Sequence, residues 1–216
     1  MEKADRVEKG GRRERKKLEA RERLLAAARQ VLAESGEANL RIGDLTEMAD
    51  IGFGTFYSHF ESKEALVEAV LLEVMAGAAA AIGSRALEFP DPAETASFAY
   101  RRFIRFAADE PELAAVLTKL DDSDAMFEQS LLPYARKTLE RGIESGRFDI
   151  VDIDLALLSV SAAAFAAIKG VLAGRIGADS AGAGAEMMLR AFGLTNKEAR
   201  EISRRPLPSL DLHVSD

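Results

Sequence analysis

Apolar residues recur at three- and four-residue spacing along most of the chain, and no stretch alternates convincingly with period two. The first such run, Leu24 to Leu32, is followed by Gly36, a residue that commonly ends helices. Similar runs predict helices at about 12–35, 42–49, 53–59, 62–86, 93–108, 111–120, 124–146 (kinked at Pro133), 152–172 and 181–192. The pattern therefore predicts an all-α protein of about nine helices with no sheet.

The breaks between these runs divide the chain into two domains and a tail. Ser62 is typical of an N-cap before a long helix, and Pro90 and Pro92 interrupt the chain after that helix. We expect an N-terminal three-helix domain at 1–62, a helical domain at 63–203 and a tail at 204–216.

Composition excludes several classes of site. The 216 residues contain no Cys and two His, which rules out disulfides, thiolate-bound metals and multi-histidine centres. Asp121, Asp122 and Asp124 cluster, but no nucleophile motif or phosphate-binding loop accompanies them. We therefore expect no enzyme activity, no cofactor and no metal. The chain has no run of about 18 uninterrupted apolar residues and no signal peptide, so we expect a cytoplasmic protein outside the membrane.

Charge is distributed unevenly about the formal net value of −7. Residues 1–23 carry 10 basic and 6 acidic side chains, with a dense basic run at 12–17, whereas residues 64–216 carry 16 basic and 24 acidic side chains. A basic arm before an acidic body is compatible with nucleic-acid binding, but a charge run by itself is more typical of a solubilising tail, so a neighbouring motif has to decide.

The stretch LRIGDLTEMADIGFGTFYSHFESKEAL, residues 40–66, predicts a helix-turn-helix at about 42–60 followed by a capped helix. Two such short helices are stable only when packed together, and the apolar residues expected to pack them are Leu45, Met48, Ile51, Phe56 and Phe60. Hydroxyl and imidazole groups suited to phosphates or base edges then project from the second helix.

The segment GTFYSHFESKEAL resembles the most characteristic stretch of the tetracycline-repressor (TetR) family of bacterial transcriptional regulators, and the similarity covers about residues 21–72. The resemblance implies a DNA-binding domain of three helices, followed by about six helices for ligand binding and dimerisation. It further implies a ligand-responsive repressor that binds a palindromic operator in double-stranded DNA as a homodimer.

The resemblance also implies residue roles. Gly54 and Thr55 match the recognition helix, Tyr57, His59 and Lys63 match phosphate-contacting positions, and Phe53 and Ser58 occupy variable positions that tend to meet bases. The full set expected at the DNA is Arg41, Thr46, Gly52, Phe53, Gly54, Thr55, Tyr57, Ser58, His59 and Lys63.

The chain departs from the family pattern at three places. The turn reads Ala49-Asp50-Ile51-Gly52 where Ala-Gly-Val-Ser is usual, Arg41 replaces a common capping Thr, and Gly43 replaces a longer side chain. Asp tolerates a left-handed backbone, so the turn should still form. These departures leave a second interpretation open, a helical small-molecule-binding or adaptor protein that no longer binds DNA.

The C-terminal helices suggest a dimer interface and a ligand pocket. The segments 152–172 and 181–192 are rich in small residues that allow close helix packing, so they form either the homodimer interface or ordinary core. We expect an apolar effector, acyl or aromatic, whose polar end meets Arg102, Arg105 or Lys169. The candidate pocket residues are Phe103, Phe106, Leu117, Met126, Phe127, Leu131, Tyr134 and Phe165.

Overall fold

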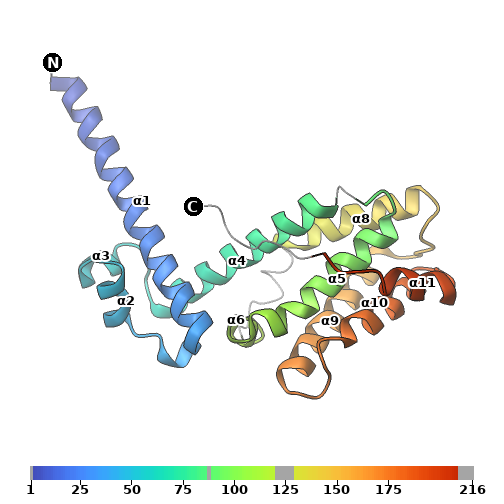
Figure 1. The fold of residues 1–216 in the computed structure, drawn as a ribbon. Helices are drawn as coiled ribbons and strands as arrows, with labels where there is room; N and C mark the ends of the chain where they lie inside the picture. The colour runs from blue at the N-terminus through green and yellow to red at the C-terminus, as the bar shows by residue number, and fades with distance from the viewer. Residues whose placement is uncertain (1, 87–88, 120–128, 209–216) are drawn as a thin grey trace. The chain divides into compact units, whose positions relative to one another are not determined.

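The computed structural model describes residues 2–86, 89–119 and 129–208, and within these ranges the chain is helical with no strand (Figure 1). The all-α prediction is confirmed. The helices in these ranges are α1 (Glu2–Ser35), the 3₁₀ turn η1 (Glu37–Asn39), α2 (Ile42–Met48), α3 (Phe53–Tyr57), α4 (Lys63–Ala86), α5 (Pro92–Asp109), α6 (Pro111–Leu117), α8 (Leu132–Glu144), α9 (Ile153–Leu172), α10 (Ser180–Ala191) and α11 (Asn196–Ser203).

The chain forms two compact units, residues 1–71 and 72–216, and the division falls inside α4. The boundary expected from the sequence, 62/63, coincides with the first residue of that helix. Ser62 caps α4 as predicted, because its Oγ accepts a hydrogen bond of 3.1 Å from the Ala65 N–H.

The N-terminal unit is held together by an apolar core shared by α1, α2 and α3. Leu24 and Leu32 of α1, Leu45 of α2 and Phe56 of α3 are all fully buried. The packing role expected of Met48 is wrong, because its side chain is 47% exposed. The inward face of α2 continues from Leu45 to the buried C-cap Ala49, four residues later, which leaves Met48 at the edge of that face.

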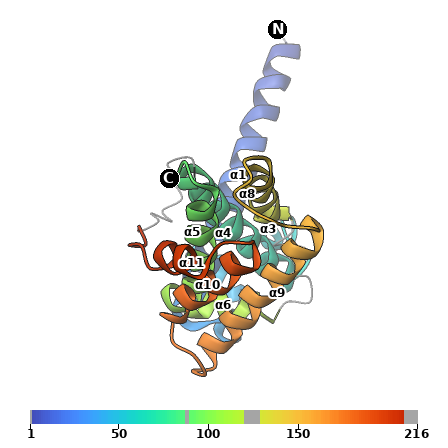
Figure 2. The same ribbon diagram turned by 90° about the vertical axis from the view of Figure 1, so that its right-hand side faces the viewer.

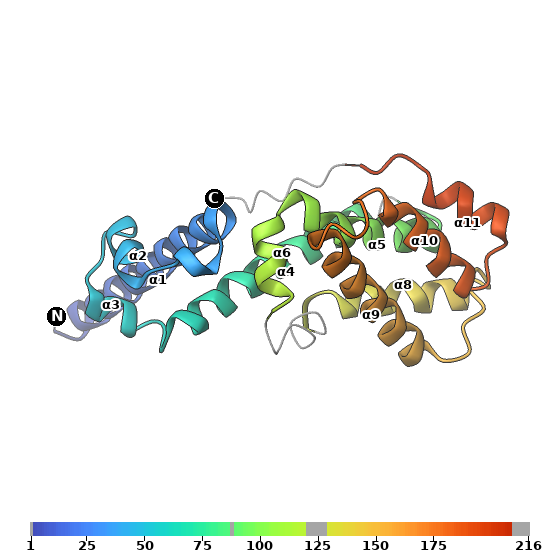
Figure 3. The ribbon, with the colours of Figure 1, turned by 90° about the horizontal axis from the view of Figure 1, so that it is seen from below.

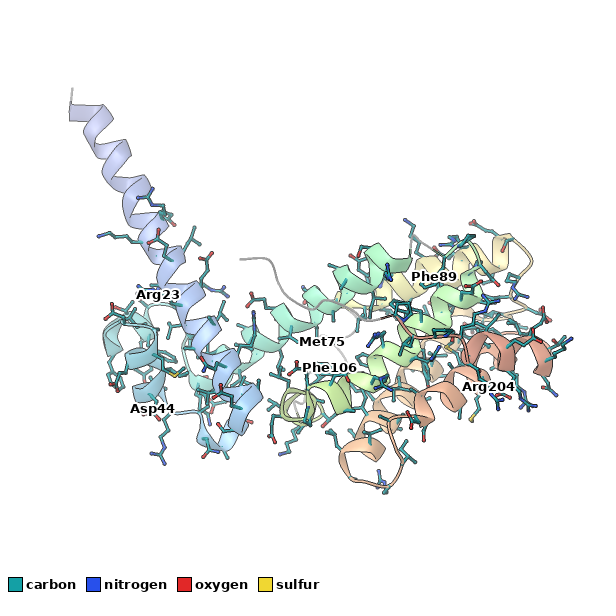
Figure 4. The ribbon with its side chains drawn as sticks, viewed as in Figure 1. Arg23, Asp44, Met75, Phe89, Phe106 and Arg204 are labelled. Atoms are coloured by element: carbon teal, nitrogen blue, oxygen red, sulfur yellow. The ribbon has the colours of Figure 1, made fainter. Side chains whose placement is uncertain are left out.

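The turn between α2 and α3 places Asp50 at a φ of 50°, the left-handed conformation expected from the sequence. The Ile51 N–H closes the turn by donating to the Thr46 carbonyl oxygen at 2.9 Å. Arg23 of α1 extends toward this turn and lies 3.9 Å from the Asp50 carboxylate (Figure 4).

In the C-terminal unit, α5 is the central helix and packs against α8, α9, α10 and α11 (Figures 2 and 3). The Asp91 carboxylate caps α5 by accepting from the Ala93 N–H at 2.9 Å, and Pro92 occupies the first turn. Asp91 also holds Arg147, whose guanidinium bridges to Glu198 of α11 at 3.1 Å. This network connects the N-terminus of α5 to α11.

Two helix boundaries and one whole helix differ from the sequence prediction. Helix α1 begins at Glu2 rather than near Arg12. Helix α8 begins at Leu132, after a turn at Leu131, so Pro133 lies in its first turn, where the backbone needs no N–H donor. Helix α11 was missed, although Thr195 and Glu198 form a capping box that its sequence could have revealed.

Residues 204–208 of the expected tail lie along α5. Arg101 donates to the Arg205 carbonyl oxygen at 2.8 Å, and the Arg102 Nε donates to that of Pro208 at 2.8 Å. Among the residues named from the sequence, Asp121, Asp122, Asp124, Met126 and Phe127 lie outside the described residues.

Candidate functional site

Helix α3 is anchored by one aromatic residue and presents two others to the surface. Phe56 is fully buried, whereas Phe53 is 57% and Tyr57 58% exposed. Gly52 is the N-cap, and its carbonyl oxygen accepts from the Thr55 N–H at 2.9 Å. The buried ring therefore fixes the helix while its first turn and its opposite face remain accessible.

The structure brings most residues expected at the DNA onto the surface of this unit. Thr55, His59 and Lys63 are half-buried, and the exposed members are Arg41, Gly52, Phe53, Gly54, Tyr57 and Ser58. Thr46 does not join them, because it is buried and its hydroxyl donates to the Gly43 carbonyl oxygen at 2.8 Å.

Two cations of α1 face His59. Partial burial, and then the positive charges of Lys17 and Arg21, lower the pKa of His59, so the imidazole is neutral near pH 7. The Arg21 guanidinium also lies 5.3 Å from the centre of the Phe60 ring. Sequence reasoning counted both cations in the basic arm, residues 1–23, but named neither as a site residue, although their four-residue spacing indicates a shared helix face.

Lys63 begins α4 beside this surface. Its Nζ lies 3.8 Å from the Glu37 carboxylate, and its side chain remains 30% exposed. An ammonium with one weak, partly exposed ion pair is available to a phosphate. The N-terminal unit thus places two cations near His59, just after α3, and a third at the start of α4.

The C-terminal unit contains a cavity of about 560 Å³, within the usual range for small-molecule sites. Its walls come from the end of α4 (residues 80–84) and from α5, α8, α9 and α10. Of the predicted pocket residues, Phe103, Leu131 and Tyr134 line it, while Phe106, Leu117 and Phe165 are buried away from it.

Sequence reasoning missed the polar part of the cavity wall. Tyr100, whose pKa is raised by burial, lines the cavity, and so do Lys137 and Arg141. The cations expected there, Arg102, Arg105 and Lys169, are not in its wall.

Comparisons with known proteins agree with this arrangement. The sequence profile "Bacterial regulatory proteins, tetR family" matches residues 24–70, and the profile "Tetracyclin repressor-like, C-terminal domain" matches residues 91–205, more than half of the chain. The chain belongs to the TetR family. It is therefore a transcriptional regulator with a helix-turn-helix DNA-binding domain.

Individual relatives cover the chain to different extents. The structure of RolR in complex with resorcinol is 33% identical, with a TM-score of 0.80, and the match covers 91% of this chain and 98% of RolR. FadR from Bacillus subtilis, in complex with stearoyl-CoA, is 18% identical with a TM-score of 0.65 over 78% of this chain and 97% of FadR, and shows a shared fold. The regulator UidR of Escherichia coli K12 is 40% identical over 53 residues, so the match spans 24% of this chain and 27% of UidR.

Proposed function

We propose that this TetR-family protein is a ligand-responsive repressor that binds a palindromic operator as a homodimer. The observation that carries the proposal is the accessible face of α3, flanked by Lys17, Arg21 and Lys63. Such a helix enters the major groove, and the surrounding cations hold the phosphates on either side. Two copies would read half-sites about one helical turn apart.

The homodimer proposal rests on the two apolar faces of α9. One face packs into the core through Leu157 and Ile168, while the other exposes Leu155 (63%) and Leu158 (69%). Helix α10 lies beside α9 and adds Met187, which is 70% exposed (Figure 2). An uncovered apolar surface of this kind marks an association site, and pairing with a second copy gives the two-fold symmetry that a palindrome requires.

The same two-faced composition accounts for a membrane-like signal. By length and hydropathy alone, Lys63–Arg85 and Ile153–Leu172 could cross a membrane. We propose instead that α4 is apolar because it enters the core and α9 because it serves both core and dimer, in a cytoplasmic protein.

Leu158→Glu tests the dimer. A charge on the proposed interface should convert the protein to a monomer in analytical ultracentrifugation and weaken operator binding, because the free energy of pairing two half-sites is lost. Ile143→Glu alters an exposed apolar residue on α8 and should leave the dimer intact. A wild-type protein that sediments as a monomer would contradict the proposal.

The ligand response is proposed for the cavity of the C-terminal unit. Helix α4 carries Lys63 at its first residue and supplies cavity wall at residues 80–84, so one helix belongs to both sites. RolR holds resorcinol and FadR holds stearoyl-CoA, which supports a largely apolar effector. The effector would act by binding more tightly to a conformation whose two reading heads do not match the operator.

The experiment for the function is selection of bound sequences from random DNA, followed by fluorescence-anisotropy titration of the selected operator with and without candidate ligands. Recovery of a palindrome and ligand-dependent release are expected. Thermal-shift panels of lipophilic and polar compounds test the effector class, and stabilisation by polar compounds alone would contradict it. Absence of salt-dependent DNA binding would favour the alternative, a small-molecule-binding or adaptor protein.

A further inference from the structure

The described wall of the cavity is mainly apolar with a few hydroxyl groups, and its charged residues are Lys137 and Arg141, which form its basic edge. Lys137 and Arg141 stand four residues apart on α8, so they project from the same helix face. The described wall contains no Asp or Glu. The cavity therefore carries positive charge that its own lining does not neutralise.

Arg141 is the half-buried member of this pair, and it is held in place by the backbone. Its Nη2 donates to the carbonyl oxygens of Pro90 at 3.2 Å and of Phe89 at 3.4 Å; Phe89 can be found in Figure 4. Within the ranges that the structure describes, no carboxylate lies within ion-pair distance of Arg141 or Lys137. A fixed, partly desolvated guanidinium with donors to spare is a binding group for an anion.

Other arginines of this unit show the contrast. Arg102 lies 3.7 Å from Asp109, and Arg105 lies 3.7 Å from Asp179. Arg136, on the same helix as Arg141 but outside the cavity wall, pairs with Asp154. A carboxylate within ion-pair distance is thus common among the arginines of this unit, and among the described residues neither Arg141 nor Lys137 has one.

Two of the hydroxyl groups on the wall are hydrogen-bonded within their own helices. Thr138 donates to the Tyr134 carbonyl oxygen at 2.9 Å, and Ser161 donates to that of Leu157 at 2.8 Å. The phenolic hydroxyls of Tyr100 and Tyr134 add polar groups to the wall. Away from these phenols and the basic edge, the lining is mainly apolar and favours an apolar ligand surface.

We propose that the effector is an amphipathic anion, with one carboxylate bound by Arg141 and Lys137 and an apolar ring or acyl body in the rest of the cavity. This inference rests on the proposed function and names the chemistry of its ligand. A ring and a medium-length chain present the same carboxylate, so the experiment includes both.

The test is isothermal titration calorimetry of the full-length protein at pH 7.5 with matched ligand sets. One set is octanoate, octanamide and octan-1-ol, the second is 3-phenylpropionate with its amide and alcohol, and resorcinol and octanoyl-CoA are added singly. A charge-assisted hydrogen bond in place of a neutral one should make an acid bind about ten- to a hundredfold more tightly than its amide.

Variants assign the effect to the cavity edge. Arg141→Gln should reduce acid binding to the level of the amide, Arg141→Lys should retain part of it, and Lys137→Gln should cause a smaller loss. Arg136→Gln removes the same charge from the same helix outside the cavity and should change ligand affinity little. Circular dichroism and melting temperature check that each variant is folded.

The inference would be overturned if amides, alcohols or resorcinol bound more tightly than the acids. It would also be overturned if the thioester octanoyl-CoA bound while both free acids did not, or if folded Arg141→Gln bound the acids as tightly as the wild type. Operator binding without ligand is measured separately. If acids bind but do not release DNA, the proposed ligand response fails and the anion site stands. If only neutral compounds bind, and they release the protein from DNA, the proposed ligand response stands and the anion site fails.

Discussion

Gly142→Ala should destabilise the C-terminal unit strongly, because the space beside Gly142 is filled. Gly142 is buried near the end of α8, and a Cβ at this position would lie 1.9 Å from Cδ2 and 2.4 Å from Cε2 of Phe148. The Phe148 ring cannot easily withdraw. The backbone N–H of Phe148 donates to the Gly142 carbonyl oxygen at 2.9 Å, and the centre of the Phe148 ring lies 5.2 Å from the centre of the Phe192 ring.

One cost and one gain set the magnitude. A separation of 1.9 Å is too short for a small shift of the helix to relieve, so the ring has to leave its place in the core, at a cost of about 3–5 kcal/mol. Alanine recovers about 1 kcal/mol in helix propensity over glycine. We therefore expect the free energy of unfolding to fall by about 2–4 kcal/mol, a large share of the roughly 5–15 kcal/mol typical of a folded protein.

Urea unfolding followed by circular dichroism measures this change. Gly11→Ala is the control, because the added methyl group meets no atom within 4 Å apart from its neighbours in the chain and the nearby backbone of its own helix, and it should not lower stability. In Phe148→Ala the collision is removed, so adding Gly142→Ala to that variant should cost nothing further. Wild-type stability of Gly142→Ala, or costs that add in the double variant, would refute the packing argument.

Three further predictions concern the DNA-binding surface and the acid limb of stability. Lys63→Ala should weaken operator binding and lower the slope of log affinity against log salt concentration by about two per dimer. Tyr57→Phe should weaken operator binding about fivefold. Gel-shift titrations at several salt concentrations measure both effects, and unchanged affinities would remove these phosphate contacts from the interface. Because the pKa of His59 is lowered, DNA binding should take up protons and strengthen as pH falls from about 7.5 to 6, and this dependence should vanish in His59→Asn. Burial alone would raise the pKa of Asp91, but hydrogen bonds from Arg147 and the Ala93 N–H lower this pKa overall. The ionised carboxylate therefore stabilises the fold above about pH 4, and this contribution is lost as the pH falls through the lowered pKa. Asp91→Asn should therefore flatten the acid limb of a stability–pH curve, and an unchanged limb would argue against the network.

The helix-turn-helix was predictable because its determinants are local. Ser62 caps α4 by accepting a hydrogen bond from the N–H of Ala65, three residues later, and Asp50 adopts the left-handed conformation that its short side chain tolerates. The error at Met48 has a local origin too, since the buried Ala49, four residues after Leu45, takes the inward position on α2. Thr46 was expected at the DNA, but the structure buries it, and its hydroxyl donates to a carbonyl oxygen of its own helix.

The basic edge of the cavity could not be predicted in this way, because it depends on which arginines already have partners. Arg105 lies 3.7 Å from the Asp179 carboxylate, far along the chain, and Arg141 is positioned by carbonyl oxygens about fifty residues before it. A count of charges treats these residues as equal, and only the tertiary structure shows that Arg105 has a carboxylate neighbour whereas Arg141 has none among the described residues. The proposed site for the polar end of the effector therefore follows from this difference and from the cavity beside Arg141, rather than from the density of arginines in the sequence.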